Sequence, residues 1–85
     1  MNKNEILSKL VPILSKQLSV ESDQITGSSS IVDDLGADSL DTAEIAMMIQ
    51  EEFGYDLKDH EMQAIKTVDD IVHILEADET VKNKN

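Results

Sequence analysis

The stretch Leu35-Gly36-Ala37-Asp38-Ser39-Leu40-Asp41 separates a loop rich in serine and glycine from an apolar run with helical spacing. Asp38 is a favoured N-cap residue, and Asp41, three residues later, can reach back to complete a capping box. The sequence therefore predicts that Ser39 occupies the first position of a helix, where its hydroxyl faces solvent beside free backbone N–H groups. Such a helix end favours a phosphate, although a serine at this position is more often only part of a cap.

The helix that begins at Ser39 is predicted to extend to about Phe53, with two different faces. One face is expected in the core and carries Ile45, Ile49 and Phe53, with Ala46 and Met48 beside it. The other face is an apolar strip edged by polar and acidic residues: Leu40, Asp41, Ala43, Glu44, Met47, Gln50 and Glu51. A strip of this kind predicts a partner-binding surface, and the alternative is that Met47 packs against a neighbouring helix.

An apolar stripe near the N-terminus predicts a first helix that is capped by Asn2 or Asn4 and ends at about Leu18. Pro12 lies inside this helix, which predicts a kink or a loose first turn. Residues 19–37 are rich in serine and glycine and predict a long loop. The expected anchors of this loop are Ile25, Ile31, Val32 and Leu35, with a short helical turn near Ser22–Ile25.

Two further helices are predicted after Phe53. A short third helix is expected to be capped by Asp59 and to carry Met62 and Ile65. Thr67 can cap a fourth helix, and its N3 residue Asp70 completes a capping box. These segments predict an all-α fold, a small four-helix bundle of three longer helices and one short helix, with the long loop between helices one and two.

The length and composition predict one small domain. The chain has 85 residues, and we expect residues 1–78 to form the domain and residues 79–85 to be a disordered tail. There is no cysteine, which excludes a disulfide framework and a thiolate metal site. No apolar run approaches the roughly 20 residues of a membrane span, and no secretory signal is visible. We therefore expect a cytoplasmic monomer.

The charge is strongly acidic and unevenly distributed. The net charge is −11, with three acids balanced by three lysines over residues 1–32 and fifteen acids against two lysines over residues 33–79. This charge excludes nucleic acid and anionic membranes as expected partners and favours basic protein surfaces. The alternative is that the acidic residues serve only solubility.

Catalytic and metal-binding motifs are not found. A nucleophile elbow around Ser39 would need glycines where Ala37 and Asp41 stand. The two histidines, His60 and His73, are distant from Ser39 in sequence. The acidic run does not fit the ligand spacing of a calcium-binding EF-hand loop. We therefore predict neither a catalytic residue nor a metal site.

The run Val32-Asp33-Asp34-Leu35-Gly36-Ala37-Asp38-Ser39-Leu40-Asp41-Thr42 resembles the attachment motif of acyl carrier proteins. The resemblance continues through Glu51-Glu52-Phe53 to Ile65-Lys66-Thr67-Val68. It implies that Ser39, beside Asp38, carries a covalent 4′-phosphopantetheine arm through a phosphodiester. Acyl chains would be held on the thiol of the arm as thioesters, so the protein would be a carrier and not an enzyme.

The Leu-Gly-Ala-Asp-Ser-Leu-Asp run is similar to the bacterial fatty-acid type of carrier. The resemblance then implies a phosphopantetheinyl transferase and fatty-acid synthesis enzymes with basic docking patches as partners. Gln50 and Lys58 depart from the usual family pattern, which keeps open a carrier of a specialised polyketide-like or lipid-modifying pathway. A third alternative is an interaction module regulated by phosphorylation at Ser39, which a mass measurement would distinguish.

Overall fold

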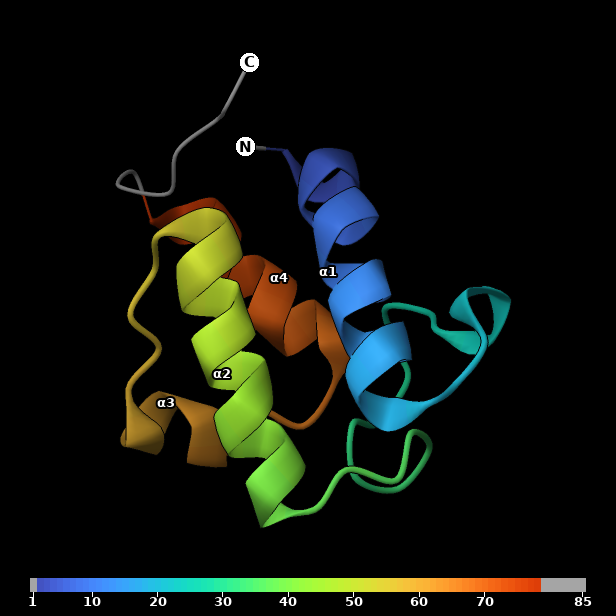
Figure 1. Cartoon of the computed structure of the whole chain (residues 1–85). Coiled ribbons are helices and arrows are strands. Elements are labelled where there is room, and N and C mark those ends of the chain that lie inside the picture. Colours follow the sequence, from blue (N-terminus) through green and yellow to red (C-terminus); the bar gives the residue numbers. More distant parts are fainter. Residues whose placement is uncertain (1, 79–85) are drawn as a thin grey trace.

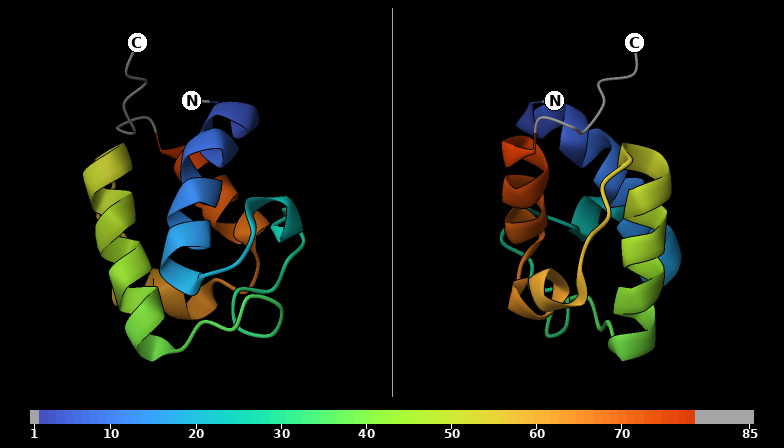
Figure 2. Two further views of the ribbon diagram at one scale, coloured as in Figure 1. Left: turned by 45° about the vertical axis from the view of Figure 1, so that its right-hand side comes forward. Right: turned by 90° about the vertical axis from the view of Figure 1, so that its left-hand side faces the viewer.

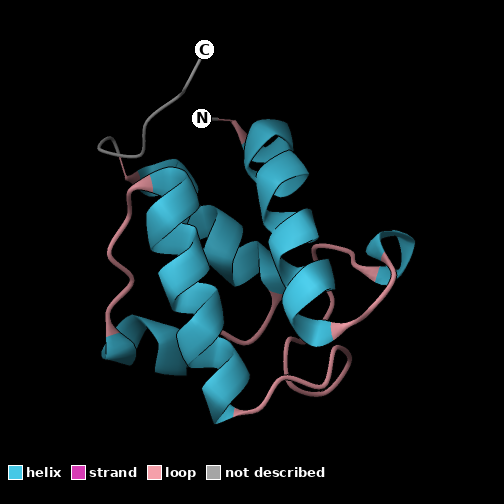
Figure 3. Ribbon diagram, viewed as in Figure 1, coloured by secondary structure: helices cyan, strands magenta, loops and turns pink. Residues whose placement is uncertain are grey.

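The computed structural model describes residues 2–78, and the predicted disordered tail of residues 79–85 lies outside them. The elements are α1 (Lys3–Leu18), the 3₁₀ helix η1 (Ser22–Gln24), α2 (Ser39–Phe53), α3 (Asp59–Ala64) and α4 (Val68–Ala77). Figure 3 shows these helices and the long loop between the first two α-helices. The predicted all-α architecture of three longer helices and one short one is confirmed. Between residues 2 and 78, the one β feature is an isolated bridge between Ser30 and Thr67.

The helices place the start of α2 at the end of the bundle opposite the start of α1. The main packing joins α1 with α2 and α1 with α4. Figure 1 shows that α1 and α2 run in opposite directions, so the last turn of α1 lies at the same end as the first turn of α2. The two further views in Figure 2 place the short α3 at that end as well.

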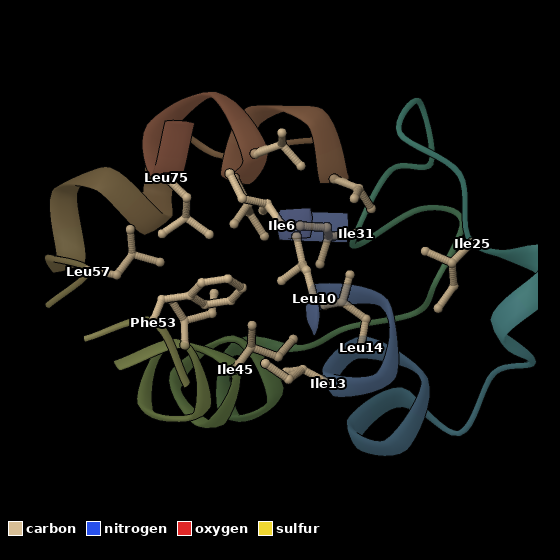
Figure 4. Packing of buried hydrophobic residues seen from close by; sticks show 14 of the residues in the cluster. Ile6, Leu10, Ile13, Leu14, Ile25, Ile31, Ile45, Phe53, Leu57 and Leu75 are labelled. Carbon is tan, nitrogen blue, oxygen red and sulfur yellow. The ribbon is translucent and has the colours of Figure 1, made fainter. Parts of the chain in front are cut away.

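The core is aliphatic with a single phenylalanine, and it lies between α1, α2 and α4. Its helical members are Ile6, Leu10, Ile13 and Leu14 of α1, Ile45, Ile49 and Phe53 of α2, and Val68, Ile71, Val72 and Leu75 of α4. Figure 4 shows the labelled side chains of these three helices pointing toward one another, whereas Ile25 lies to one side, on the long loop. Burying such a side chain contributes about 1.5–3 kcal/mol relative to exposure, and these three helices hold most of the buried apolar side chains.

The first helix begins at the predicted asparagine cap. The Oδ1 atom of Asn2 accepts the Glu5 N–H at 2.9 Å, and the Glu5 carboxylate accepts the Asn2 N–H at 3.3 Å. The alternative of a loose first turn is therefore wrong, and the helix continues through Pro12 to its end. Pro12 leaves the Ser8 carbonyl without its helical donor, but Ser8 is exposed, where water can hydrogen-bond the carbonyl. A kink at Pro12 stays a prediction.

The long loop is fastened to the start of α4 by backbone hydrogen bonds. The Ile31 N–H donates to the Lys66 carbonyl at 2.9 Å, the Val68 N–H to the Ser29 carbonyl at 3.1 Å, and the Asp69 N–H to the Gly27 carbonyl at 2.8 Å. The predicted anchors Ile25, Ile31 and Leu35 are buried, and the helical turn is η1. This loop is therefore a fixed part of the bundle.

Val32 does not anchor the loop, and that expectation is wrong. The N–H groups of Asp34 and Leu35 both donate to the Ser30 carbonyl, which folds residues 31–35 into a tight turn. The turn directs Ile31 and Leu35 into the core and leaves Val32 59% exposed on the opposite side.

The third helix begins one residue earlier than predicted. Lys58 is the N-cap and Asp59 the first helical residue, so Asp59 is not the cap, and Ile65 lies just beyond the helix as its C-cap. A lysine side chain carries no acceptor atom, so it cannot cap the helix. The start of α3 is held instead by the Glu61 carboxylate, which accepts the Lys58 N–H at 3.1 Å. The hydroxyl of Tyr55 also donates to Glu61 at 2.6 Å, and this bond is the main cause that raises the pKa of Tyr55 to about 12.

The fourth helix has the predicted capping box. The Thr67 hydroxyl accepts the Asp70 N–H at 3.3 Å, and the Asp70 carboxylate accepts the Thr67 N–H at 3.0 Å. The same carboxylate accepts the Lys66 N–H at 2.8 Å. These backbone donors, first that of Lys66 and then that of Thr67, lower the pKa of Asp70 below its usual value.

Candidate functional site

The start of α2 is a closed capping box around Ser39. The Oδ1 atom of Asp38 accepts the Asp41 N–H at 2.9 Å, and Oδ2 of Asp41 accepts the Asp38 N–H at 3.2 Å. Asp38 has an extended backbone, and Ser39 is the first helical residue. The predicted cap and the predicted position of Ser39 are both confirmed.

The residues before the cap bring Ser39 to the surface. Gly36 has a φ of +77°, in the left-handed region that glycine adopts without strain. Ala37 is 4% exposed and its N–H donates to the Ile31 carbonyl at 3.0 Å, which anchors the chain immediately before the cap. Asp38 and Ser39 are exposed. The serine hydroxyl is therefore held at a fixed place and remains accessible to solvent.

Two hollows open on either side of Ser39. One, of about 510 Å³, extends along α2 toward α3 and is lined by Ala43, Met47 and Leu57 among others. The second, of about 370 Å³, extends toward the long loop and is lined by Ile31, Val32, Ala37 and Ile65 among others. Both hollows also share Thr42, Met62 and Gln63. A group attached to Ser39 would therefore have mixed apolar and polar surface within reach.

Sequence reasoning did not identify these shared lining residues as site residues. Thr42 belongs to the same first turn as Ser39, and its hydroxyl donates to the Ser39 carbonyl at 2.9 Å. Its position three residues after the serine was the available signal. Met62 and Gln63 lie on α3, more than 20 residues later, and no local pattern indicated their approach to Ser39.

The predicted partner strip of α2 is exposed. Leu40 and Met47 are 69% and 62% exposed, and with Val32 they are the large apolar side chains that residues 2–78 leave most open. Ala43, Glu44, Gln50 and Glu51 are exposed as well, and Asp41 is half-buried. The alternative that Met47 is covered by a neighbouring helix is wrong. The strip continues without interruption from Ser39, so a partner seated on it would meet the serine.

Other kinds of site are not seen in the described part of the chain. No group of three or more histidine, cysteine or acidic side chains within residues 2–78 could hold a metal ion. No helix among the described residues is long and apolar enough to cross a membrane.

The sequence profile of one protein family, described as "Phosphopantetheine attachment site", matches residues 8–75. An acyl carrier protein of Prochlorococcus marinus is 46% identical over 77 residues, which cover 91% of this chain and 96% of the relative. Acyl carrier proteins of Thermosynechococcus vestitus and Thermotoga maritima are each 41% identical over 75 residues, which cover 88% of this chain and 93% of each relative.

The fold, the exposed serine at a helix start and these matches together define a carrier domain. The chain belongs to the acyl carrier protein family, whose domain bears a phosphopantetheine attachment site. The resemblance drawn from the motif around Ser39 is thereby confirmed. A member of this family carries 4′-phosphopantetheine covalently and is a carrier, not an enzyme.

Proposed function

We propose that Ser39 is the phosphopantetheine attachment residue and that the protein carries acyl intermediates of fatty-acid biosynthesis. The observation that carries this proposal is the exposed Ser39 hydroxyl at the first position of α2, fixed by the Asp38–Asp41 capping box. Of the serines within the matched residues, Ser39 is the one at the start of a helix that borders both hollows.

The residues around Ser39 fit a phosphodiester followed by a long arm. The first turn of α2 places free backbone N–H groups and the positive end of the helix dipole beside Ser39. The nearby carboxylates of Asp38 and Asp41 repel an anion, so the covalent bond rather than charge attraction must hold the group. When bound, the group supplies a thiol that carries acyl chains as thioesters. The two hollows offer surfaces on which an attached arm can lie.

The exposed strip of α2 is the proposed docking surface for the enzymes that modify or use the carrier. Its apolar residues, Leu40, Ala43 and Met47, offer the central contact, and the acids Asp41, Glu44 and Glu51 are at its edges, with Gln50. Charge complementarity indicates partners with basic patches, including a phosphopantetheinyl transferase and fatty-acid synthesis enzymes. Charges at the rim of an interface accelerate association more than they slow dissociation, which suits a carrier that visits many enzymes.

The fatty-acid assignment is supported by the Leu-Gly-Ala-Asp-Ser-Leu-Asp run, and the name acyl carrier protein that the relatives bear supports an acyl cargo. We further propose that the carrier acts as a cytoplasmic monomer with residues 1–78 as its functional domain. Between residues 2 and 78, the large apolar side chains are buried or half-buried, apart from Val32, Leu40 and Met47.

To test the attachment site, protein that lacks the arm is incubated with coenzyme A, magnesium and a broad-range phosphopantetheinyl transferase. Its intact mass is then measured. We expect one arm on the wild type and none on Ser39→Ala. Ser28→Ala is the matched control, because it removes an exposed serine of the long loop, and it should be loaded like the wild type. An arm on Ser39→Ala would contradict the assignment.

The pathway is tested by the intact mass of protein isolated from its native host. A ladder of acyl chains that differ by C2H4 units would support fatty-acid synthesis. A single acyl group outside such a ladder would contradict that pathway while leaving Ser39 as the attachment residue.

A further inference from the structure

A side-chain hydrogen bond joins the last turn of α1 to the first turn of α2. The amide nitrogen Nε2 of Gln17 lies 3.2 Å from Oδ1 of Asp41, across 24 positions of sequence. A carboxylate only accepts, so the Gln17 amide must present its nitrogen here. Gln17 and Asp41 are both half-buried, which shields their hydrogen bond from water more than an exposed bond would be.

This bond engages the second oxygen of a carboxylate that already holds the cap. Oδ2 of Asp41 accepts the Asp38 N–H at 3.2 Å, while Oδ1 accepts from Gln17. Asp41 therefore connects two things, the turn that carries Ser39 and the helix α1. Its side chain cannot change rotamer without losing both bonds.

Helix α1, which carries Gln17, is well packed in the core. Four side chains of α1 are at most 8% exposed, and α1 packs against both α2 and α4. The first turn of α2, in contrast, lies at the surface, beyond the buried residues Ile45 and Ile49. A helix end of this kind frays unless side chains hold it.

We propose that Gln17 is a positioning residue for arm transfer: through Asp41 it holds the turn that bears Ser39 in the orientation required at the transferase. The inference rests on Ser39 as the attachment residue. Gln17 does not touch the serine and acts only through the Asp41 carboxylate. Because its amide is neutral, it fixes Asp41 without cancelling the negative charge that a basic partner recognises.

Two substitutions of nearly equal size separate this role from simple packing. Gln17→Met keeps the length of the side chain but removes the donor. Gln17→Glu places a second carboxylate against Asp41 and replaces the hydrogen bond with repulsion. Gln24→Met, at an exposed position of η1, is the matched control.

The first measurement is amide hydrogen exchange by NMR in protein without the arm. We expect the N–H groups of Asp38 and Asp41 to exchange roughly 2-fold to 10-fold faster in Gln17→Met, which is the range for one net hydrogen bond. The amides near Phe53, at the far end of α2, should keep their wild-type rates. Faster exchange along the whole of α2 would indicate a packing defect and would overturn the positioning role.

The second measurement is the steady-state kinetics of arm transfer with the carrier as the varied substrate. We expect kcat to fall roughly 2-fold to 10-fold in Gln17→Met and further in Gln17→Glu, with KM unchanged or lower. The added negative charge of Gln17→Glu can only strengthen docking to a basic enzyme, so a lower kcat without a higher KM identifies a misplaced serine. Raising the salt concentration should recover the extra loss in Gln17→Glu but not the loss in Gln17→Met.

The inference is overturned if both Gln17 variants are loaded with wild-type kcat at low salt, or if Gln24→Met shows the same loss. A wild-type protein that acquires no arm on Ser39 would instead refute the proposed attachment site. In that case the exchange rates of Asp38 and Asp41 still report whether Gln17 holds the cap, so the two failures are distinguishable.

Discussion

Replacing Asp38 with alanine removes the side chain that closes the first turn of α2. The side chain of Asp38 makes one hydrogen bond, in which its Oδ1 accepts the Asp41 N–H at 2.9 Å. Truncating an acidic N-cap to alanine typically costs about 1 kcal/mol, within a range of roughly 0.5–2 kcal/mol. The lost attraction of a negative charge to the helix dipole, about 0.3–1 kcal/mol, is offset by relief of repulsion in this acidic protein.

The assay compares Asp38→Ala with Asp38→Asn. Asparagine caps a helix about as well as aspartate but carries no charge, so it separates capping from electrostatics. For a domain of this size, 1 kcal/mol corresponds to about 4–8 °C in Tm, which we expect to be lost in Asp38→Ala and largely retained in Asp38→Asn. Arm transfer should also be slower in Asp38→Ala, because Ser39 belongs to the turn that frays.

Two results would refute this reasoning. If Asp38→Ala had the same Tm as the wild type, the cap would not hold the start of α2. Equal melting temperatures for Asp38→Ala and Asp38→Asn, both well below the wild type, would mean that the charge of Asp38 stabilises the helix and its hydrogen bond does not.

Three further predictions concern charge. Millimolar magnesium or added salt should raise the Tm by screening the repulsion within residues 33–79, and an unchanged Tm in all conditions would show that the acids do not strain the fold. Glu44→Lys should slow arm transfer about 2-fold to 30-fold at low salt, since a rim attraction of about 0.2–1 kcal/mol becomes a repulsion of similar size, a change of about 0.4–2 kcal/mol. Its Tm should be nearly unchanged, and wild-type transfer rates would place the docking surface elsewhere. The lowered pKa of Asp70 means that its ionised form stabilises the fold above pH 3.8, its usual pKa, and loses this effect as the pH falls through the folded value. The stability difference between wild type and Asp70→Asn in urea should therefore be larger at pH 6 than at pH 3, and an equal or larger difference at pH 3 would contradict this origin.

The parts of the fold that local chemistry determines were predictable from sequence. The cap of α2 depends on residues only three positions apart, Asp38 and Asp41, and the cap of α4 likewise depends on Thr67 and Asp70. The buried and exposed faces of α2 also followed from helical periodicity, because a helix places every third or fourth residue on one side.

The parts that depend on distant neighbours were not predictable in this way. Val32 is apolar like the buried Ile31 beside it. Only the turn formed on the Ser30 carbonyl sends the side chain of Ile31 into the core and that of Val32 into solvent. The link from Gln17 to Asp41 requires α1 and α2 to be packed first, so neither residue reveals it alone. The candidate site was predicted from its motif, whereas its surroundings required the packed structure.

The backbone bonds between the long loop and the start of α4 have a consequence for the order of events during synthesis. The residues that fasten the loop before Ser39 are 66–69, so they leave the ribosome after the serine does. At a synthesis rate of about 5–20 residues per second, the delay is roughly 1.4–6 seconds. During that interval the nascent chain presents Ser39 on a loop whose anchor has not yet been made. Under the proposal that Ser39 receives the arm at the folded start of α2, a chain truncated before Lys66 is expected to escape modification.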